Sequence, residues 1–234
     1  MRVAPFCTLA AAACLLVPAL IAAQGAAAQT EANRLVAGGG ITVTGWTGTT
    51  DKASDLLNTA KLAPEGPGMR VTTGPAVTYW NPANKATGDY TVKATFNEPK
   101  FMNLNDHPHP YGIMIAGNDM GTPQQSYLYC AAYGNGNFIV RGFGPAAFQM
   151  NGRAGGPAAS VHKAAGKDSP VTQDIAVSVK GTKVTCTING ADVATYDKSE
   201  LVTAGKLKST DGIYGIRFAH NTDAVVTGLT MTKN

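Results

Sequence analysis

The sequence predicts an all-β fold: a single domain built as an antiparallel jelly-roll β-sandwich. Short runs of alternating β-branched and aromatic residues predict the strands, and Gly, Pro and Asn clusters between them predict the turns. Charged residues make up only 15% of the chain and Gly numbers 27, a composition that suits many turns between short strands. With 234 residues, the chain is long enough for one sandwich with its own core.

The first 28 residues are predicted to be a signal peptide. Arg2 supplies the positive start, Phe6–Ala23 is apolar and rich in Ala, and Ala26 to Ala28 form a small-residue cleavage site. A membrane anchor is the alternative, but Pro18 breaks the short apolar run and no stop-transfer charges follow. We therefore expect a secreted or periplasmic protein, with no membrane span in the mature chain.

After the signal peptide, residues 29–40 are expected to form a flexible N-terminal lead, and residues 41–234 are expected to form the sandwich domain. The formal net charge is only +4, and the basic residues are spread along the chain. Nucleic-acid-binding domains concentrate basic charge on one surface, so no nucleic acid partner is expected.

The strands before the middle of the chain are short. A single helical turn is expected within Asp51–Leu62, and Asn81–Gly88 and Asn97–Pro110 are expected to be loops. Alternation of apolar and polar residues predicts strands at Ile41–Gly45, Met69–Thr73, Ala76–Trp80 and Tyr90–Phe96.

The centre of the sandwich is predicted at Tyr111–Phe143, with strands at Tyr111–Ala116, Ser126–Tyr133 and Asn137–Phe143. Asn135-Gly136 separates the last two strands and favours a type I′ hairpin turn. That turn would pair Tyr133 with Phe138, Ala131 with Val140 and Tyr129 with Gly142.

In this register, the central strand carries a row of aromatic rings on one face, formed by Tyr127, Tyr129 and Tyr133. Such a row could stack sugar rings or simply pack in the core. Arg141 would lie on the opposite face, either as a binding group or extending to the sheet edge. Tyr127, Tyr129 and Arg141 are therefore candidate ligand-binding residues.

The region after the centre is predicted to begin with irregular chain at Gly144–Ser169, which holds one short strand. A second hairpin then pairs Asp174–Lys180 with Lys183–Asn189 across Gly181-Thr182, a sequence suited to a type II′ turn. Its register would place Ile175 opposite Ile188, Val177 opposite Cys186 and Val179 opposite Val184, forming an apolar core face. The remaining strands are predicted at Ala147–Met150, Asp192–Tyr196, Gly212–Ala219 and Ala224–Thr232.

Two cysteines, Cys130 and Cys186, remain after the expected cleavage. In an oxidising compartment an even pair favours a disulfide, but two separate buried thiols are the alternative.

Several stretches resemble a known fold family. Val184–Gly190 (VTCTING), Asp211–Val226 (DGIYGIRFAHNTDAVV) and His109–Gly112 are similar to concanavalin A-like lectin/glucanase sandwiches. More narrowly, they resemble secreted bacterial domains known as domain of unknown function 1080, or 3-keto-disaccharide hydrolase-like. The resemblance implies two antiparallel sheets and engagement of carbohydrate by a sheet face or by rim loops.

The densest group of reactive side chains is Asp106, His107 and His109, which could bind a ligand or metal, or act as an acid or base. A solvated rim loop is the alternative. His220 is expected only to help cap its turn. No metal site or cofactor is predicted, although lectin-like sandwiches make calcium conceivable.

The sequence lacks the Glu-x-Asp-x-(x)-Glu strand of retaining glucanases of this fold, which argues against that chemistry. The leading hypothesis is a non-catalytic domain that binds a glycan or polysaccharide, or another partner. An enzyme that acts on carbohydrate through residues 106–109 and a structural envelope protein are the alternatives.

Overall fold

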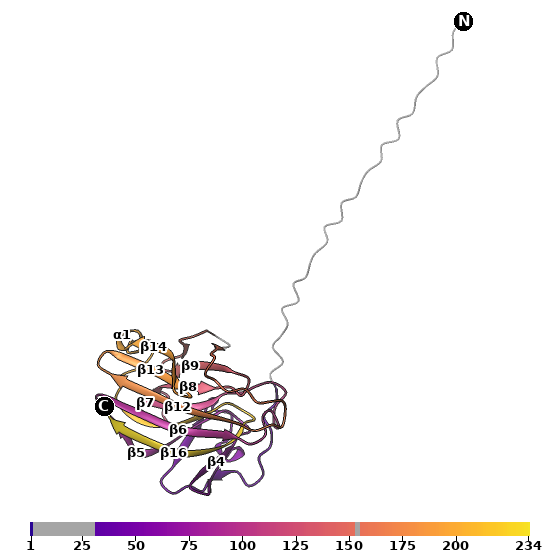
Figure 1. The fold of residues 1–234 in the computed structure, drawn as a ribbon, viewed down its shortest axis with the longest axis horizontal. Coiled ribbons are helices and arrows are strands. Elements are labelled where there is room, and N and C mark those ends of the chain that lie inside the picture. The colour runs from indigo at the N-terminus through magenta and orange to yellow at the C-terminus, as the bar shows by residue number, and fades with distance from the viewer. Residues whose placement is uncertain (2–30, 153–154) are drawn as a thin grey trace. The chain divides into compact units, whose positions relative to one another are not determined.

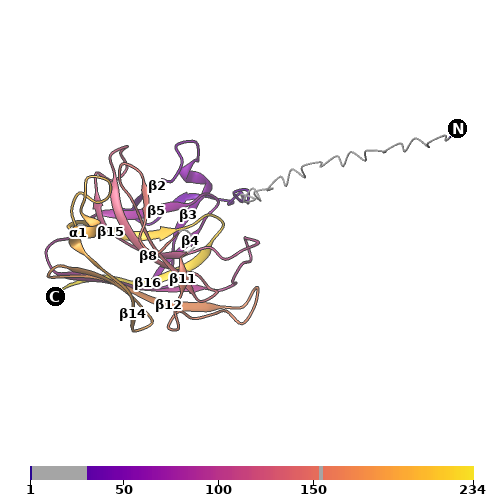
Figure 2. The same ribbon diagram turned by 90° about the horizontal axis from the view of Figure 1, so that it is seen from above.

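The structure is a computed structural model that describes Met1 and residues 31–152 and 155–234. Apart from Met1, the expected signal peptide lies outside the described residues. Glu31–Asn234 folds as one unit, in which two antiparallel sheets pack face to face (Figures 1 and 2). The predicted all-β sandwich is confirmed.

The first half of the unit contains β1 to β7 and the 3-10 helix η1. The second half contains β8 to β16 and the short helix α1. No helix in the described part of the chain is long and apolar enough to cross a bilayer. The bounds are β1 Gly40–Ile41, β2 Thr47–Thr50, η1 Leu57–Thr59, β3 Lys61–Glu65, β4 Gly68–Thr72, β5 Val77–Ala86, β6 Tyr90–Glu98, β7 Tyr111–Asn118, β8 Ser126–Ala132, β9 Asn137–Phe143, β10 Ala147–Gln149, β11 Gly156–Pro157, β12 Val171–Lys180, β13 Lys183–Ile188, β14 Ala191–Asp197, α1 Lys198–Leu201, β15 Gly212–Phe218 and β16 Asp223–Lys233.

We call the two layers sheet A and sheet B. Sheet A has the order β1-β3-β4-β16-β6-β12-β13-β14, and sheet B has the order β10-β9-β8-β7-β15-β5-β2, with β11 added beside β9. The two-residue pairing of β1 with β3 is parallel, whereas the other pairs are antiparallel. Strands far apart in sequence lie side by side, as in β15 between β5 and β7.

The core lies between the sheets and is built by strict alternation. In β12, Val171, Ile175, Val177 and Val179 are buried, while Thr172, Asp174 and Lys180 between or after them are exposed. This is the period of two that a half-buried strand requires.

The second hairpin has the predicted register. β12 and β13 pair Ile175 with Ile188, Val177 with Cys186 and Val179 with Val184. Gly181 has a φ of 54°, which the turn requires and which glycine adopts without a steric penalty. Cys186 of this hairpin is joined by a disulfide to Cys130 of β8, with Cα atoms 6.0 Å apart, so the bond crosses from sheet A to sheet B.

The predicted register of the central hairpin is wrong by one residue. β8 pairs with β9 so that Tyr127 faces Phe143, Tyr129 faces Arg141 and Ala132 faces Phe138. Of the two turn residues, only Gly136 has a positive φ, at 95°, so a type I′ turn does not form. Since a slip of one residue moves side chains to the other face, Arg141 lies on the same face as Tyr129, not opposite it.

Two smaller predictions also fail. The expected strand Ile41–Gly45 is reduced to Gly40–Ile41, because a turn follows at once and Gly45 has a φ of 77°. The expected loop Asn81–Gly88 belongs largely to β5, which pairs with β15 again at Lys85 and Ala86 after an irregularity opposite Pro82. The proline needs no ladder hydrogen bond in that gap.

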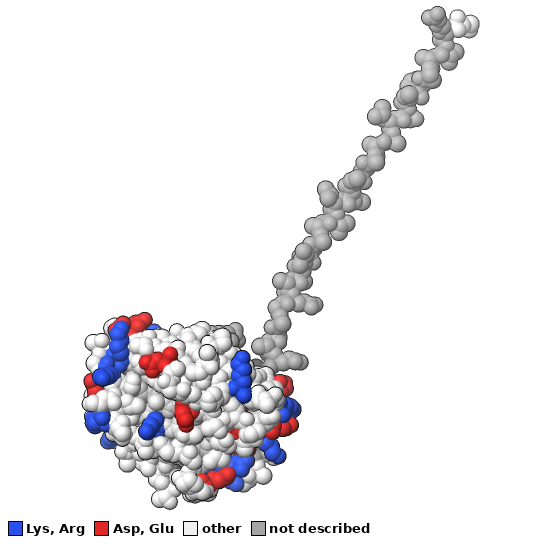
Figure 3. Space-filling view, viewed as in Figure 1, with Lys and Arg blue, Asp and Glu red and all other residues white. Residues whose placement is uncertain are grey.

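Charges are dispersed on the face of the unit seen in Figure 3, where Lys and Arg lie among Asp, Glu and a larger uncharged area. The expectation that nucleic acid is not a partner rests on this modest charge and stays a prediction.

Glu98 at the end of β6 is a buried carboxyl, only 3% exposed. Its Oε1 accepts a hydrogen bond from the Met102 N–H at 3.2 Å, while Oε2 has no partner among the described residues. Burial, with a smaller contribution from Asp223, raises the pKa of Glu98 to about 7 from an ordinary value of 4.5. Tyr111 also faces this carboxyl.

This raised pKa predicts a pH-dependent stability. Between pH 4.5 and 7, the folded state holds a proton that the unfolded state has lost, so the free energy of unfolding falls as pH rises. The full loss above pH 7 is about 3 kcal/mol. Glu98→Gln is expected to remove this slope and to be the more stable protein at pH 8, as measured by urea unfolding across this range. Exposed Glu65→Gln is the control, and a wild-type-to-E98Q difference that does not vary with pH would contradict the prediction.

Candidate functional site

Sheet B has two buried faces, and the second one carries the first candidate site. Leu128, Cys130 and Ala132 of β8 point into the main core, whereas Tyr127, Tyr129 and Ala131 point to the opposite side. This outer face of sheet B, turned away from sheet A, forms its own apolar cluster, which includes Trp80, Met114, Tyr127, Tyr129, Ala131 and Ile139.

An ion pair between a buried arginine and a partly exposed aspartate lies on this outer face. Arg217 of β15 is 5% exposed and donates from Nη1 and Nη2 to the two carboxylate oxygens of Asp51, at 2.6 and 2.5 Å. Its guanidinium carbon lies 5.4 Å from the ring centre of Tyr129 and 5.6 Å from that of Phe143. Burial alone would lower the pKa of Arg217, but the Asp51 carboxylate, together with Tyr127 and Tyr129, outweighs burial and holds that pKa above its ordinary value. Arg217 is therefore a fixed cation.

A cavity of about 210 Å³ opens beside this ion pair. Arg141 also lines it and forms no ion pair with any described residue, so its guanidinium is free to meet a ligand. The cavity is smaller than the roughly 300–1,000 Å³ typical for drug-sized ligands, and suits a single ring or substituent. Its walls are Asp51, Ala76, Pro110, Tyr129, Tyr133, Ile139, Arg141, Arg217, Ala219 and His220.

A larger cavity of about 700 Å³ lies at the opposite end of β8, near Ser126. Its described walls are prolines, aliphatic side chains and polar side chains, with Lys206 and Lys208 among them, and none of these described residues is aromatic. It lacks the combination of rings and directed hydrogen-bond donors found in the smaller cavity.

The sequence candidates divide at this site. Tyr129 and Arg141 both line the cavity, while Tyr127 does not, and its hydroxyl accepts a hydrogen bond from Thr78 at 3.0 Å. Sequence reasoning missed Arg217 and Asp51. An arginine within the otherwise apolar run Gly212–Phe218 was the available signal, since a buried arginine needs a partner.

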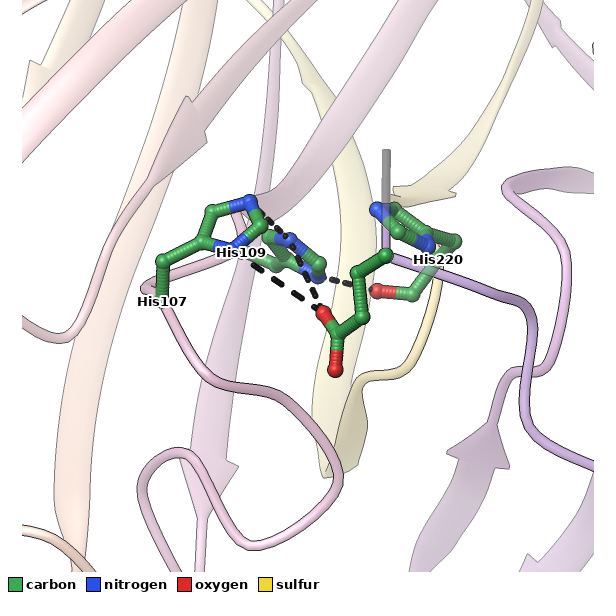
Figure 4. A group of neighbouring side chains, drawn as sticks. His107, His109 and His220 are labelled. Carbon is green, nitrogen blue, oxygen red and sulfur yellow. Dashed lines mark hydrogen bonds and ion pairs between the residues drawn. The ribbon is translucent and has the colours of Figure 1, made fainter. Parts of the chain in front are cut away.

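A second candidate site borders the first and is built around three imidazoles (Figure 4). His107 and His109 come from the loop before β7, and His220 comes from the turn between β15 and β16. Glu31, from the start of the described unit, is the fourth member. One potential ligand atom from each of the four residues lies within 4.8 Å of the others.

Asn221 holds the N-terminal segment against these histidines. Its side chain accepts the Arg34 N–H at 2.7 Å and donates to the Ala32 carbonyl at 2.9 Å, which positions Glu31 just before. The buried Asn105 side chain donates to the Asn221 carbonyl at 2.8 Å and ties the histidine loop to the same turn. These two amides bring three distant parts of the chain together.

The three histidines differ in exposure, and burial lowers the pKa of two of them. The side chain of His109 is 5% exposed, and burial, assisted by His220, lowers its pKa to about 4. Burial also lowers the pKa of His220. His107 is half exposed and forms a short hydrogen bond with the exposed Asp106, which lowers the pKa of that carboxyl.

The structure thus places the sequence candidates Asp106, His107 and His109 together, and adds His220 and Glu31. His220 is not merely a turn residue, because its side chain stacks 4.1 Å from His109 between ring centres and also lines the cavity. No local sequence pattern links Glu31 or His220 to the histidine loop, because the members of the group are separated by up to 189 positions.

No protein-family model matches the chain, and no curated protein matches it in sequence. Among solved structures, the carbohydrate-binding module CBM66 from Bacillus subtilis has a TM-score of 0.54 at 11% identity, covering 83% of this chain and 99% of the module. A Bacillus subtilis protein of unknown function with a galectin-like fold has a TM-score of 0.52 at 12% identity, covering 80% and 89%. The fold is that of the concanavalin A-like lectins and glucanases. At these identities the likeness shows the fold alone, and it does not show the narrower resemblance to domain of unknown function 1080.

Proposed function

We propose that the domain binds a glycan in the cavity on the outer face of sheet B. The observation that carries this proposal is the meeting of the Tyr129 and Tyr133 side chains with the unpaired Arg141 in one cavity. Aromatic rings offer flat apolar surfaces that can pack on a sugar ring, and polar groups at the edge fix its orientation. The fold is shared with a carbohydrate-binding module, which supports the same class of ligand.

The charge of the cavity favours an acidic sugar. Asp51 is neutralised by Arg217, so among the described residues of the lining the Arg141 guanidinium is the uncompensated charge. Guanidinium binds carboxylate through two parallel hydrogen bonds, which are stronger than neutral ones. A uronate residue of a polysaccharide would supply that carboxylate.

The same lining favours binding over two-carboxylate hydrolysis. That mechanism needs a pair of carboxyl groups on either side of the scissile bond. Among the described residues of the lining, Asp51 is the single carboxylate, and Arg217 occupies both of its oxygens. The described lining therefore lacks the two free carboxyl groups that this hydrolysis requires, and it suits binding of a ligand.

Removing the Arg141 charge is the direct test. The full chain carrying Arg141→Ala is expected to bind an immobilised uronate polysaccharide about ten- to a hundredfold more weakly, since one charge-assisted hydrogen-bonding group contributes roughly 1.5–3 kcal/mol. Wild-type protein should be retained less on a neutral glucan than on a uronate polymer. Affinity electrophoresis at fixed ionic strength measures both.

Lys180→Ala is the matched control, because it removes one exposed positive charge from β12 in the other sheet. Equal losses of retention in the two variants would mean that net charge alone drives binding and would overturn the proposal. Absence of retention of the wild type on every polysaccharide would favour a structural envelope role.

An enzyme remains the second candidate because His107 is hydrogen-bonded to Asp106, an arrangement that can orient an imidazole for acid–base chemistry. The resemblance to 3-keto-disaccharide hydrolase-like domains points the same way. New reducing ends or a keto-sugar product from incubated glycan, lost in His107→Ala, would establish it, whereas retention without product supports the binding domain.

We also propose that the chain is exported. The disulfide between Cys130 and Cys186 supports an oxidising compartment, where such bonds persist. Mass spectrometry of the protein from its own cells should find Gln29 as the first residue, and an intact N-terminal segment would contradict export by cleavage.

A further inference from the structure

The hydrogen bonds around two histidines fix where their lone pairs point. His109 Nδ1 lies 2.5 Å from the carbonyl oxygen of His220, and His107 Nδ1 lies against the carboxylate of Asp106. Both partners are acceptors, so each Nδ1 must carry the proton that it donates. Each neutral ring is then left with an unprotonated Nε2.

These two Nε2 atoms face each other at 2.8 Å. Two lone pairs at that separation repel unless a cation lies between or beside them. Either an added proton or a metal ion can supply this positive charge. The surroundings of the pair decide between the two.

Glu31 supplies the deciding observation. Its Oε2 is buried, makes no hydrogen bond with any described residue, and lies 3.8 Å from His109 Nε2. It also lies 3.9 Å from His107 Nδ1. A buried carboxylate oxygen without a donor is costly, and a shared proton between the two imidazoles would not reach it. A metal ion bound to all of them would satisfy the nitrogens and the oxygen together.

The spacing and the donor types indicate which metals. Tetrahedral zinc with bonds of about 2.0–2.1 Å separates its ligand atoms by about 3.3 Å. The 2.8 Å and 3.8 Å contacts at His109 Nε2 lie on either side of that value. Three imidazoles and one carboxylate suit zinc and neighbouring transition metals, whereas calcium and magnesium prefer oxygen ligands.

We propose that His107, His109, His220 and Glu31 form a binding site for a divalent transition metal, with zinc as the expected occupant. Asp106 is a positioning residue, because its hydrogen bond to Nδ1 turns the His107 Nε2 toward the metal, as carboxylates do behind many zinc-bound histidines. The bound metal would fasten the N-terminal segment to two loops at the rim of the cavity, where His220 belongs to both sites.

Metal titration of the full chain tests this site. After treatment with a chelator and removal of that chelator, isothermal titration with zinc chloride is expected to show one zinc bound per chain. Cobalt(II) should give the intense visible absorption of a four-coordinate site. Zinc should raise the melting temperature, because a ligand that binds only the folded state stabilises it.

The chain has four histidines, and the one outside the cluster provides a matched control. His162 lies outside the cluster, where its Nδ1 is 2.8 Å from the Thr172 carbonyl oxygen, and His162→Ala should bind zinc like the wild type. His107→Ala and Glu31→Gln should each weaken zinc binding at least tenfold, and Asp106→Asn should weaken it about ten- to a hundredfold. His107 is half exposed, so its variant keeps the test valid if the buried His109→Ala does not fold.

Three results would overturn the proposal. If the wild type binds no zinc, the two histidines share a proton instead of a metal ion. If the double variant His107→Ala with Glu31→Gln still binds zinc as the wild type does, the metal binds elsewhere. Calcium could stabilise the chain while zinc does not, which would be incompatible with three imidazole ligands.

Discussion

Asp51→Asn is expected to lower the free energy of unfolding by about 3–5 kcal/mol, because it leaves the Arg217 guanidinium buried without its counter-charge. Arg217 is 5% exposed and donates two hydrogen bonds to that carboxylate. The neighbouring Tyr129 and Phe143 rings attract the cation but offer no acceptor of comparable strength. The pair therefore stabilises the outer face of sheet B only while both members are present.

A double-mutant cycle measures this dependence. Asp51→Leu combined with Arg217→Met should cost less than the sum of the two single changes, because the double variant leaves no unpaired charge. Urea unfolding followed by tryptophan fluorescence reports on it, since Trp80 belongs to the same apolar cluster.

The exposed pair of Lys183 and Asp197 provides the control for this cycle, with nitrogen and oxygen 2.9 Å apart. Lys183→Ala should cost less than about 1 kcal/mol, as exposed ion pairs generally do. Additive losses in the Asp51 and Arg217 cycle would contradict the account that the buried Arg217 depends on Asp51.

Loss of the disulfide should have an effect of similar size. Cys130 and Cys186 are separated by 56 positions. Closing a loop of that length removes enough entropy from the unfolded chain to stabilise the fold by about 4 kcal/mol. The bond also joins the two sheets at buried positions, so its removal should loosen their packing.

The double variant Cys130→Ala with Cys186→Ala should unfold at a lower urea concentration than the oxidised wild type. Wild-type protein treated with a thiol reductant should match the double variant to within about 1 kcal/mol, because alanine leaves only small gaps. Equal stability of the oxidised and reduced wild type would show that the bond does not constrain the chain.

The two hairpins show what local sequence can and cannot determine. Gly181-Thr182 joins strands that each carry an uninterrupted apolar alternation, so turn and pattern specify one register, and the structure has it. In β8, by contrast, all seven residues are buried, and β9 carries buried apolar residues on both faces. Because neither strand has a fully polar face, the register was predicted from Asn135-Gly136 alone. In the structure residues 133–136 connect the strands, and this longer connection shifts the pairing by one residue.

This one-residue shift in register explains why the sequence did not predict that Tyr129 and Arg141 line the same cavity. The predicted register separated Arg141 from Tyr129, whereas the observed pairing makes them direct neighbours across the strands. The histidine cluster had a local signal in Asp106 to His109. Glu31 and His220 carried none, because they join the cluster through the side chain of Asn221 and through strand order, both properties of the whole fold.

The proposal that an acidic sugar binds beside Arg141 is tested most directly by an NMR titration of the full chain with a uronate oligosaccharide. Saturable chemical-shift changes are expected at Tyr129, Tyr133 and Arg141, and they should be lost in Arg141→Ala while Lys180→Ala retains them. Changes confined to the larger cavity near Lys206 and Lys208, or no saturable change at all, would contradict the proposed site.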